Sequence, residues 1–423
     1  MQPQTSTDQQ TDQHTAWKLC RRLMWFLSPI VILVLVPELA LWKTGETWPA
    51  NHAAYKQQTT TEETLYSREF LSQQFGVYKF ATIQLRNPKI IALGSSRVMQ
   101  FRDFMFSPLE DSFYNAGGMI QSVTELNEYV DLLENQQLPR PEIAIIGIDP
   151  WWIKSEYERD KSWLSQQDET YHFAAHVNAL RTLVRRNRIP ELTTAIIHSN
   201  RSPYFGYRAI GTAPIKYGSG FRKDGSWQYS PKILLEIVET HQFIDREDPP
   251  IIERIRFHLG NFSVPATVDP AKTSRLFSLL ERLQTLGIEV IVLLPPYSSD
   301  CMHALSTDAK LKPWWDFYQT RFVESLRSHG MHVNPAVAPQ DFGLDDTSMI
   351  DGYHPGEVFM GHIALELLRT APPESLLKQV SAQALQAKID SAFSPLGFAS
   401  PEKAISASRD AKAIALTSDA AGP

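Results

Sequence analysis

Three short apolar segments constrain the fold of this chain more than any other feature. They are KIIAL at residues 89–93, EIAIIGIDP at residues 142–150 and IEVIVLLPP at residues 288–296. Each is a nearly continuous aliphatic run that stops at glycine, proline or polar residues. Strands without apolar–polar alternation are buried on both faces, which is typical of parallel sheets. The runs therefore predict the central strands of an α/β fold.

Helical patterns separate these runs along the chain. Apolar residues recur at helical spacing in residues 119–137, 274–287, 314–330 and 356–369. Strands that alternate with amphipathic helices predict a parallel sheet between two helical layers. Such sheets bind ligands beyond the carboxyl ends of their strands. The loops after Leu93, Ile148 and Leu294 are therefore the places to search for a functional site.

Residues with catalytic chemistry lie at or near these loops. GSSR at residues 94–97 follows the first strand, YNAGGMIQS at residues 114–122 opens a helix, and MIDGYHPGEVF at residues 349–359 precedes the last helix. A serine hydroxyl is a weak nucleophile that needs a histidine base, and a carboxylate orients that histidine. Asp351 and His354 stand one turn apart, which suits such a pair.

Each motif taken alone has a structural explanation. Gly-Ser-Ser is a common turn, Asp-x-x-His occurs by chance in long chains, and a glycine pair often marks the entrance to a helix. The combination and its order along the chain are more specific. They predict that Ser96, His354 and Asp351 meet at one edge of the sheet.

This combination resembles the SGNH (GDSL-type) hydrolase superfamily. By position, Ser96 matches the nucleophile of its Gly-Asp-Ser motif, and Ser95 stands in the place of the aspartate. The resemblance implies that Asp351 and His354 complete a catalytic triad. It also implies an oxyanion hole with backbone donors at Ser96 and Gly117.

The resemblance covers roughly residues 88–149 and 288–369. It implies a flavodoxin-like three-layer fold with a parallel central sheet. Residues 151–270, rich in glycine, tyrosine and tryptophan, are interpreted as an inserted cap. The alternative is that this segment is a weakly patterned part of the core domain.

One position departs from the superfamily pattern. The third sequence block carries an asparagine whose amide donates to the oxyanion, whereas GIDPWW places Asp149 there. An ionised carboxylate cannot donate a hydrogen bond. The open alternatives are a protonated Asp149, another task for it, or a different donor. Arg97, Asn115 and the indole N–H of Trp151 or Trp152 are the candidates for that donor.

The N-terminal region carries a long apolar stretch. Residues 23–42 contain a single charged residue, Glu38. Twenty helical residues span about 30 Å, which is the hydrocarbon thickness of a bilayer. Lys18, Arg21 and Arg22 precede the stretch and predict a cytoplasmic N-terminus. We interpret it as a single transmembrane anchor; a cleaved signal peptide and a buried helix are the alternatives.

These patterns predict the following domain organisation. It comprises a cytoplasmic segment (1–22), an anchor (23–42), a juxtamembrane connector (43–87), an SGNH-like α/β domain (88–375) and a flexible Ala/Ser-rich tail (376–423). The architecture resembles envelope acyl-transfer proteins, namely the D-alanyl transfer protein of teichoic acid and alginate O-acetylation proteins. The resemblance implies an acyl donor or cell-envelope glycan as partner, beside a multi-span membrane O-acyltransferase. It implies an extracytoplasmic or periplasmic domain at the inner membrane.

Composition limits the other function classes. With 41 basic and 47 acidic residues, the chain has a net charge of −6 and no basic block typical of nucleic-acid binding. Two cysteines allow no cysteine-rich metal site, and the mechanism requires neither metal nor cofactor. A non-catalytic glycan-binding or assembly protein is the alternative function, and a secreted esterase is a third. The aromatic residues Trp151, Trp152, Tyr204 and Trp227 are interpreted as sugar-stacking or core residues.

Overall fold

The computed structural model describes most of the chain. The described residues are 7–72, 75–157, 173–185, 190, 193, 196–197, 201–202, 204–243 and 249–401. The side chains of residues 7–15 and 29–34 lie outside this description, as does the part of the predicted tail after residue 401.

A five-stranded parallel sheet forms the centre of the molecule. Its strands are β2 (Ile90–Gly94), β3 (Phe113–Gly117), β4 (Ile143–Gly147), β8 (Glu289–Leu293) and β9 (His332–Asn334). They are ordered β3-β2-β4-β8-β9, and every neighbouring pair is parallel. In chain order this is 2-1-3-4-5, the strand order of flavodoxin-like sheets. The prediction of an α/β fold with a parallel sheet is confirmed.

Strand residues alternate between two hydrophobic cores. Ile91 and Leu93 of β2 point into one core, whereas Ile90 and Ala92 point into the other. All four side chains are fully buried. Burial on both faces explains why the strand sequences read as continuous apolar runs.

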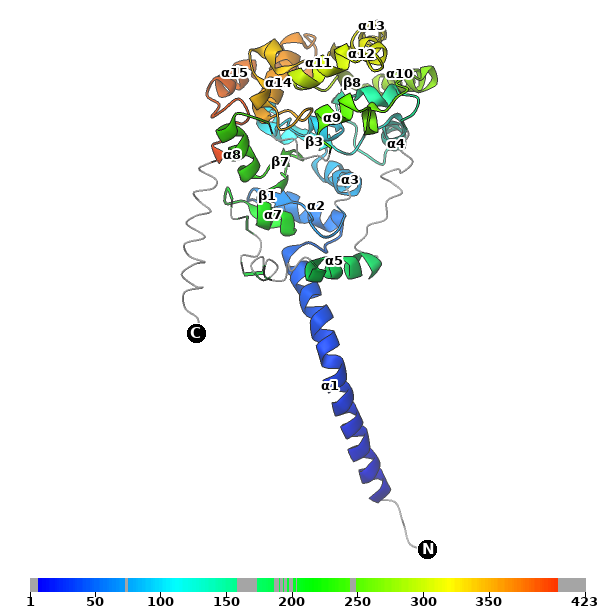
Figure 1. Ribbon diagram of the computed structural model, residues 1–423, viewed down its shortest axis with the longest axis vertical. Helices are drawn as coiled ribbons and strands as arrows, with labels where there is room; N and C mark the ends of the chain where they lie inside the picture. Colours follow the sequence, from blue (N-terminus) through cyan, green and yellow to red (C-terminus); the bar gives the residue numbers. More distant parts are fainter. Residues whose placement is uncertain are drawn as a thin grey trace.

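Helices cover both faces of this sheet (Figure 1). One core receives side chains from α4 (Val123–Glu134), α9 (Ile251–Arg256), α10 (Pro270–Thr285), α11 (Ser299–Thr307), α12 (Lys312–Gln319) and α13 (Arg321–Ser328). The opposite core receives them from α14 (Glu357–Thr370) and α15 (Ala382–Asp390). Capping residues set several helix starts: the Ser122 hydroxyl accepts from the Glu125 N–H at 3.2 Å.

A second, smaller sheet lies beside the first. It has the order β5-β1-β6-β7. Its strands are β1 (Thr64–Tyr66), β5 (Arg208–Ile210), β6 (Gly220–Phe221) and β7 (Trp227–Gln228). β1 comes from the predicted juxtamembrane connector, and the other three strands come from the predicted insertion. Residues 43–87 are therefore not a separate connector, because they form one body with part of the insertion.

The second sheet packs with helices α2 (Ala50–Thr59) and α3 (Phe75–Arg86). Ala53 of α2, Tyr78 of α3 and Phe221 of β6 share a buried cluster. Tyr78 and Phe221 stack with ring centroids 5.3 Å apart. Three further α-helices of the described residues are α5 (Phe173–Arg185), α7 (Thr212–Tyr217) and α8 (Pro231–Thr240).

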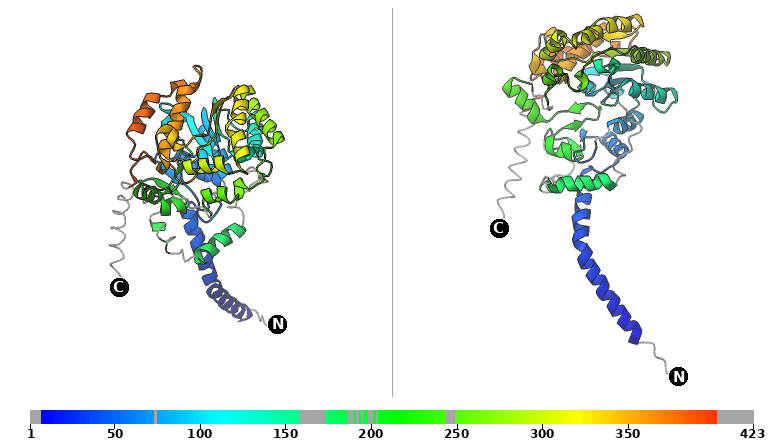
Figure 2. Two further views of the ribbon diagram at one scale, coloured as in Figure 1. Left: turned by 45° about the horizontal axis from the view of Figure 1, so that its top comes forward. Right: turned by 45° about the vertical axis from the view of Figure 1, so that its right-hand side comes forward.

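The first helix, α1 (Thr7–Thr44), projects away from the rest of the molecule (Figures 1 and 2). Of its described side chains, those at the C-terminal end pack on the body, where Ala40 and Leu41 share a cluster with Ala179 and Leu183 of α5. Within the described residues, no helix combines the length and apolar character needed to cross a membrane. The anchor predicted for residues 23–42 stays a prediction from the sequence.

The segment that begins the predicted flexible tail is part of the core. Leu377 and Val380 lie in or beside a short 3₁₀ turn (Leu376–Gln379), and α15 follows it. Their side chains and those of Leu385 and Ile389 are buried in the core that α14 covers. Residues 376–401 therefore belong to the domain, in contrast to the prediction.

Candidate active site

A tight turn at the end of β2 presents Ser96. Gly94 ends the strand with a φ of +143°, and a Cβ on it would lie 2.8 Å from the carbonyl oxygen of Gly147. Only glycine allows this close approach between β2 and β4. A 3₁₀ turn (Ser96–Val98) follows, and the Ser95 hydroxyl caps it by accepting from the Arg97 N–H at 3.4 Å. Of the two hydroxyls, Ser95 thus serves the turn and Ser96 remains available for chemistry.

Ser96, His354 and Asp351 form a hydrogen-bonded chain. The Oγ of Ser96 lies 2.8 Å from Nε2 of His354. The Nδ1 of the same ring lies 2.7 Å from Oδ2 of Asp351. Ser96 and His354 are 258 positions apart in the sequence. The structure therefore brings together the three residues that the sequence predicted to meet, in the order expected for a nucleophile, a base and an orienting carboxylate.

The local backbone holds Asp351 in place. Its Oδ1 accepts hydrogen bonds from the N–H groups of Tyr353 at 3.0 Å and His354 at 2.8 Å. Burial alone would raise the pKa of Asp351, but the imidazole of His354 and these hydrogen bonds lower its pKa below the ordinary value. Asp351 is therefore ionised at neutral pH and can stabilise a protonated His354.

A cavity opens beside Ser96. Its volume is about 310 Å³, and it is lined by Ser95, Ser96, Arg97, Gln121, Trp151, Tyr157, Asn261 and Tyr353. These residues come from the turn after β2, the entrance to α4, the turn after β4, the insertion and the Asp351–His354 loop. Three aromatic side chains, two carboxamides and two serine hydroxyls thus surround the site, with a single charged side chain.

That charged side chain, Arg97, is committed to internal contacts. Its Nη1 pairs with Oδ1 of Asp149 at 2.7 Å, and its side chain is 1% exposed. Its Nε donates to the Tyr353 carbonyl at 3.2 Å, and its Nη2 donates to the Pro295 carbonyl at 2.9 Å. The guanidinium also lies 4.0 Å from the ring centroid of Tyr297. Arg97 therefore joins the loops after β2, β4 and β8 to the Asp351–His354 loop, instead of binding a substrate.

Asp149 is the counterion of Arg97. It is fully buried and is not among the residues that line the cavity. Burial raises the pKa of Asp149, and the charge of Arg97 opposes that rise. Of the alternatives for Asp149, these contacts fit a task other than oxyanion binding. Its ion pair with Arg97 explains why a carboxylate stands at this position. A direct contact with an oxyanion does not fit this arrangement.

The candidate donors Asn115 and Gly117 are already hydrogen-bonded within the fold. The Asn115 amide donates to the carbonyls of Val98 at 2.8 Å and Phe101 at 2.9 Å. Its Oδ1 accepts the N–H of Gly117 at 2.8 Å. The Gly117 N–H is thus spent on Asn115, which disagrees with the predicted oxyanion role of Gly117.

The four aromatic candidates occupy different places. Trp151 lines the cavity and packs edge-on against Phe262, with centroids 6.1 Å apart. Trp152 is buried in the core, and Trp227 belongs to β7, where it packs on Phe221. Tyr204 lies outside the cavity lining. Of the four, Trp151 alone lines the cavity beside Ser96.

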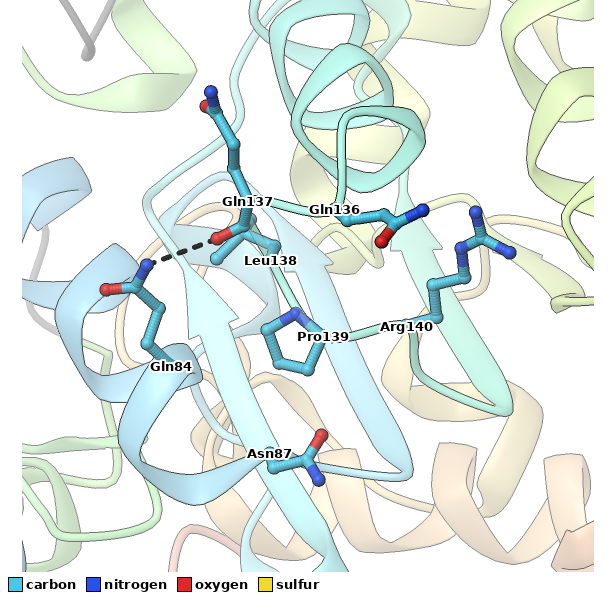
Figure 3. A pocket seen from close by; sticks show the side chains of 7 residues that line it. All are labelled: Gln84, Asn87, Gln136, Gln137, Leu138, Pro139 and Arg140. Carbon is cyan, nitrogen blue, oxygen red and sulfur yellow. Dashed lines mark hydrogen bonds between the residues drawn. The ribbon is translucent and has the colours of Figure 1, made fainter.

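A larger depression lies at the other end of the sheet (Figure 3). It measures about 630 Å³ and is lined by Gln84, Asn87, Gln136, Gln137, Leu138, Pro139 and Arg140. These residues precede β2 and β4, so they lie at the amino ends of the strands. Gln84 donates to the Gln137 carbonyl at 3.1 Å. Without a nucleophile or base among its lining residues, this depression offers no catalytic chemistry.

Sequence reasoning missed several residues of the cavity. Gln121 lies within the glycine-rich motif at residues 114–122, but nothing in that motif marks its carboxamide as functional. Tyr157 and Asn261 belong to the insertion, which carries no recognisable motif. Only the folded chain brings them to Ser96. Among the described residues, no group of histidine, cysteine and acidic side chains is arranged to hold a metal ion.

Comparisons with known proteins do not identify the chain. No family model, no curated protein and no solved structure matches it. Its function is therefore inferred from its own residues.

Proposed function

We propose that this protein is a serine-dependent acyl-transfer enzyme with an SGNH-hydrolase-like site. It transfers or removes ester-linked acyl groups of the acetyl type on a cell-envelope polysaccharide. The observation that carries the proposal is the chain of contacts from Ser96 through His354 to Asp351, beside a cavity at the carboxyl end of the sheet. The flavodoxin-like strand order and the order of the motifs along the chain support it.

The proposed reaction has two steps. The Oγ of Ser96 attacks the acyl carbonyl carbon while Nε2 of His354 takes the hydroxyl proton, and the carbonyl electron pair moves onto oxygen. The tetrahedral intermediate collapses, and the leaving alcohol departs with the proton from His354. A sugar hydroxyl or water then attacks the acyl-serine, giving its proton to His354, which returns it to Ser96. Asp351 stabilises the imidazolium in both steps.

The charge of the cavity supports an uncharged acyl group. Arg97, the one charged residue among those that line the cavity, is paired with Asp149 and donates to main-chain carbonyl groups. A cationic D-alanyl group would lack a carboxylate partner among these lining residues. An acetyl group needs none, and the face of Trp151 suits the apolar side of a sugar ring. The proposal therefore favours acetyl over D-alanyl transfer.

Location and partners belong to the same proposal. The enzyme would work outside the cytoplasmic membrane, beside a multi-span membrane O-acyltransferase that supplies or receives the acyl group. The apolar stretch at residues 23–42 supports this placement, as do exposed side chains of α1 such as Trp25 and Phe26. Co-purification of the full chain with a membrane acyltransferase from its host would test the partnership.

The experiment that tests the nucleophile is labelling with a fluorophosphonate probe. We expect the intact protein to be labelled, Ser96→Ala to lose the label, and Ser95→Ala to keep part of it, because Ser95 caps the turn and contacts Asp149 but is not the nucleophile. The hydroxyl of Ser95 makes this neighbouring variant the matched control. Undiminished labelling of Ser96→Ala would contradict the proposal.

A non-catalytic glycan-binding protein is the second candidate. It is favoured by Asp149 at the position of an amide donor and by the use of the Gly117 N–H within the fold. Under this alternative, a Ser96→Ala/His354→Ala double variant would replace the intact protein in cells, because glycan binding needs neither side chain as a catalyst. Under the enzyme proposal, the same variant fails to replace it.

A further inference from the structure

The oxyanion of the proposed reaction needs a side-chain donor beside the expected N–H of Ser96. An oxyanion hole of this kind combines backbone N–H groups with side-chain amides. Asn115, Gly117 and Asp149 are all engaged inside the fold. The side-chain donor must therefore come from another group that faces the cavity.

The carboxamide of Asn261 is such a group. Asn261 lines the same cavity as Ser96. Its main-chain carbonyl accepts from Nζ of Lys154 at 3.3 Å, but no hydrogen bond of the described residues involves its side chain. Because this side-chain amide has no hydrogen-bond partner among those residues, it is free to donate to the negative charge that develops during the reaction.

The insertion holds Asn261 against the turn that follows β4. Asn261 lies in a 3₁₀ turn (Gly260–Phe262), and the ring of Phe262 packs edge-on against Trp151. Lys154 is buried and also donates to the hydroxyl of Ser263 at 2.9 Å. These contacts fix the main chain at Asn261 and at the two residues that follow it. The same contacts position Asn261 without using the hydrogen-bonding groups of its side chain.

Gln121 is the other carboxamide in the cavity, and it is more constrained. The Nε2 of Gln121 donates to the Gly118 carbonyl at 3.1 Å, and its main-chain carbonyl accepts the Tyr157 hydroxyl at 3.2 Å. It therefore serves to hold the glycine-rich turn. Among backbone groups, the Ser96 N–H donates to no acceptor within the described residues.

We propose that Nδ2 of Asn261 is the side-chain donor to the oxyanion, together with the N–H of Ser96. The insertion would thus supply the side-chain amide donor that the superfamily pattern places at the position of Asp149. The inference rests on the proposed acyl transfer and deepens it, because it makes Asn261 a catalytic residue. Asn261→Asp would place a carboxylate where negative charge develops, whereas Asn261→Ala would remove the donor.

Steady-state hydrolysis of p-nitrophenyl acetate by the full chain tests the inference. Losing one oxyanion donor lowers kcat by about 10²–10³-fold. We expect a loss of this size for Asn261→Ala, an equal or larger loss for Asn261→Asp, and little change in KM. Asn87→Asp, an exposed residue of the opposite depression, is the matched control and should keep its activity. Thermal unfolding of each variant checks that the fold is intact.

The outcomes separate this inference from the proposed function. If Ser96→Ala loses activity and Asn261→Ala keeps kcat within about threefold, a change worth less than 1 kcal/mol, the donor role of Asn261 is overturned and the nucleophile stands. A loss confined to Gln121→Ala would assign the donor to Gln121 and also overturn the inference. If Ser96→Ala hydrolyses the ester as fast as the intact protein, the proposed function itself fails.

Discussion

Two adjacent serines at the end of β2 have different tasks because the backbone turns between them. Ser95 faces the turn and caps it, and Ser96 faces His354. The sequence alone cannot distinguish the two serines, because their hydroxyls differ only in the direction in which they point. The direction follows from Gly94, whose contact with Gly147 admits no side chain.

Asp351→Asn should abolish the proposed acyl transfer without unfolding the protein. An amide at Oδ2 would donate to Nδ1 of His354 and stabilise the wrong tautomer. In a serine protease the corresponding change lowers kcat about 10⁴-fold. We expect a loss of about 10³–10⁴-fold in the hydrolysis of p-nitrophenyl acetate at neutral pH, with KM within a few-fold. Activity within tenfold of the intact protein would contradict the role of Asp351.

Asp149→Asn tests whether that position is a lost oxyanion donor or the counterion of Arg97. Removing one partner of a buried ion pair typically costs about 3–5 kcal/mol. We expect the free energy of unfolding to fall by about 3 kcal/mol and kcat not to rise, because Asp149 does not line the cavity. Urea denaturation and ester hydrolysis measure the two quantities. Increased kcat at unchanged stability would show that the site lacks the asparagine of the superfamily pattern.

At the scale of elements, α15 is part of the domain instead of a tail. Leu385 is 3% exposed and packs into the core beneath α14. Because α14 begins three residues after His354, the same core supports the catalytic loop. The Ala- and Ser-rich composition did not predict this packing, because a short helix can pack on the core through only a few large side chains.

Leu385→Ala should therefore destabilise the whole domain. Truncating a buried leucine costs about 2–5 kcal/mol, depending on how far the cavity collapses. We expect the midpoint of urea unfolding to shift down in a single cooperative transition. Gln383→Ala, at an exposed position of the same helix, is the control and should change little. A midpoint unchanged by Leu385→Ala would support the flexible tail predicted from the sequence.

The strands and helices of the main sheet were predictable because their signals are local. Continuous apolar runs such as 142–150 indicate strands whatever surrounds them. The second sheet was not predictable, because its strands have two or three residues and pair across long separations, as Tyr66 does with Phe221. The triad was predictable from motif order. The Arg97–Asp149 pair and Asn261 were not, because only three-dimensional contacts define their roles.

At the scale of the whole molecule, buried charge links stability to pH. Asp103 lies beside Asp224, whose Oδ2 accepts the Asp103 N–H at 3.0 Å. Burial, and then the charge of Asp224, raise the pKa of Asp103 to about 6. The folded state thus binds this proton more tightly than the unfolded chain, in which the pKa is near 3.8. The contribution of Asp103 to stability is greatest in acid and falls as the pH rises through about 6.

Asp103→Asn should remove this pH dependence. The amide oxygen can still accept the Phe104 N–H, which now donates to Oδ1 of Asp103 at 2.8 Å. We expect the variant to gain stability relative to the intact protein between pH 4 and pH 7, by up to about 3 kcal/mol at neutral pH. Urea unfolding of both proteins across this range measures the difference. A difference that stays constant with pH would contradict the raised pKa.

The most direct test of the account is to trap the acyl-enzyme. The full chain is mixed with an activated acetyl ester, quenched in acid within the first turnover and digested for peptide mass spectrometry. The account predicts one acetyl group on Ser96 in the intact protein and none on that peptide in His354→Ala. Acetylation at another residue, or an unmodified Ser96 during measurable turnover, would contradict it.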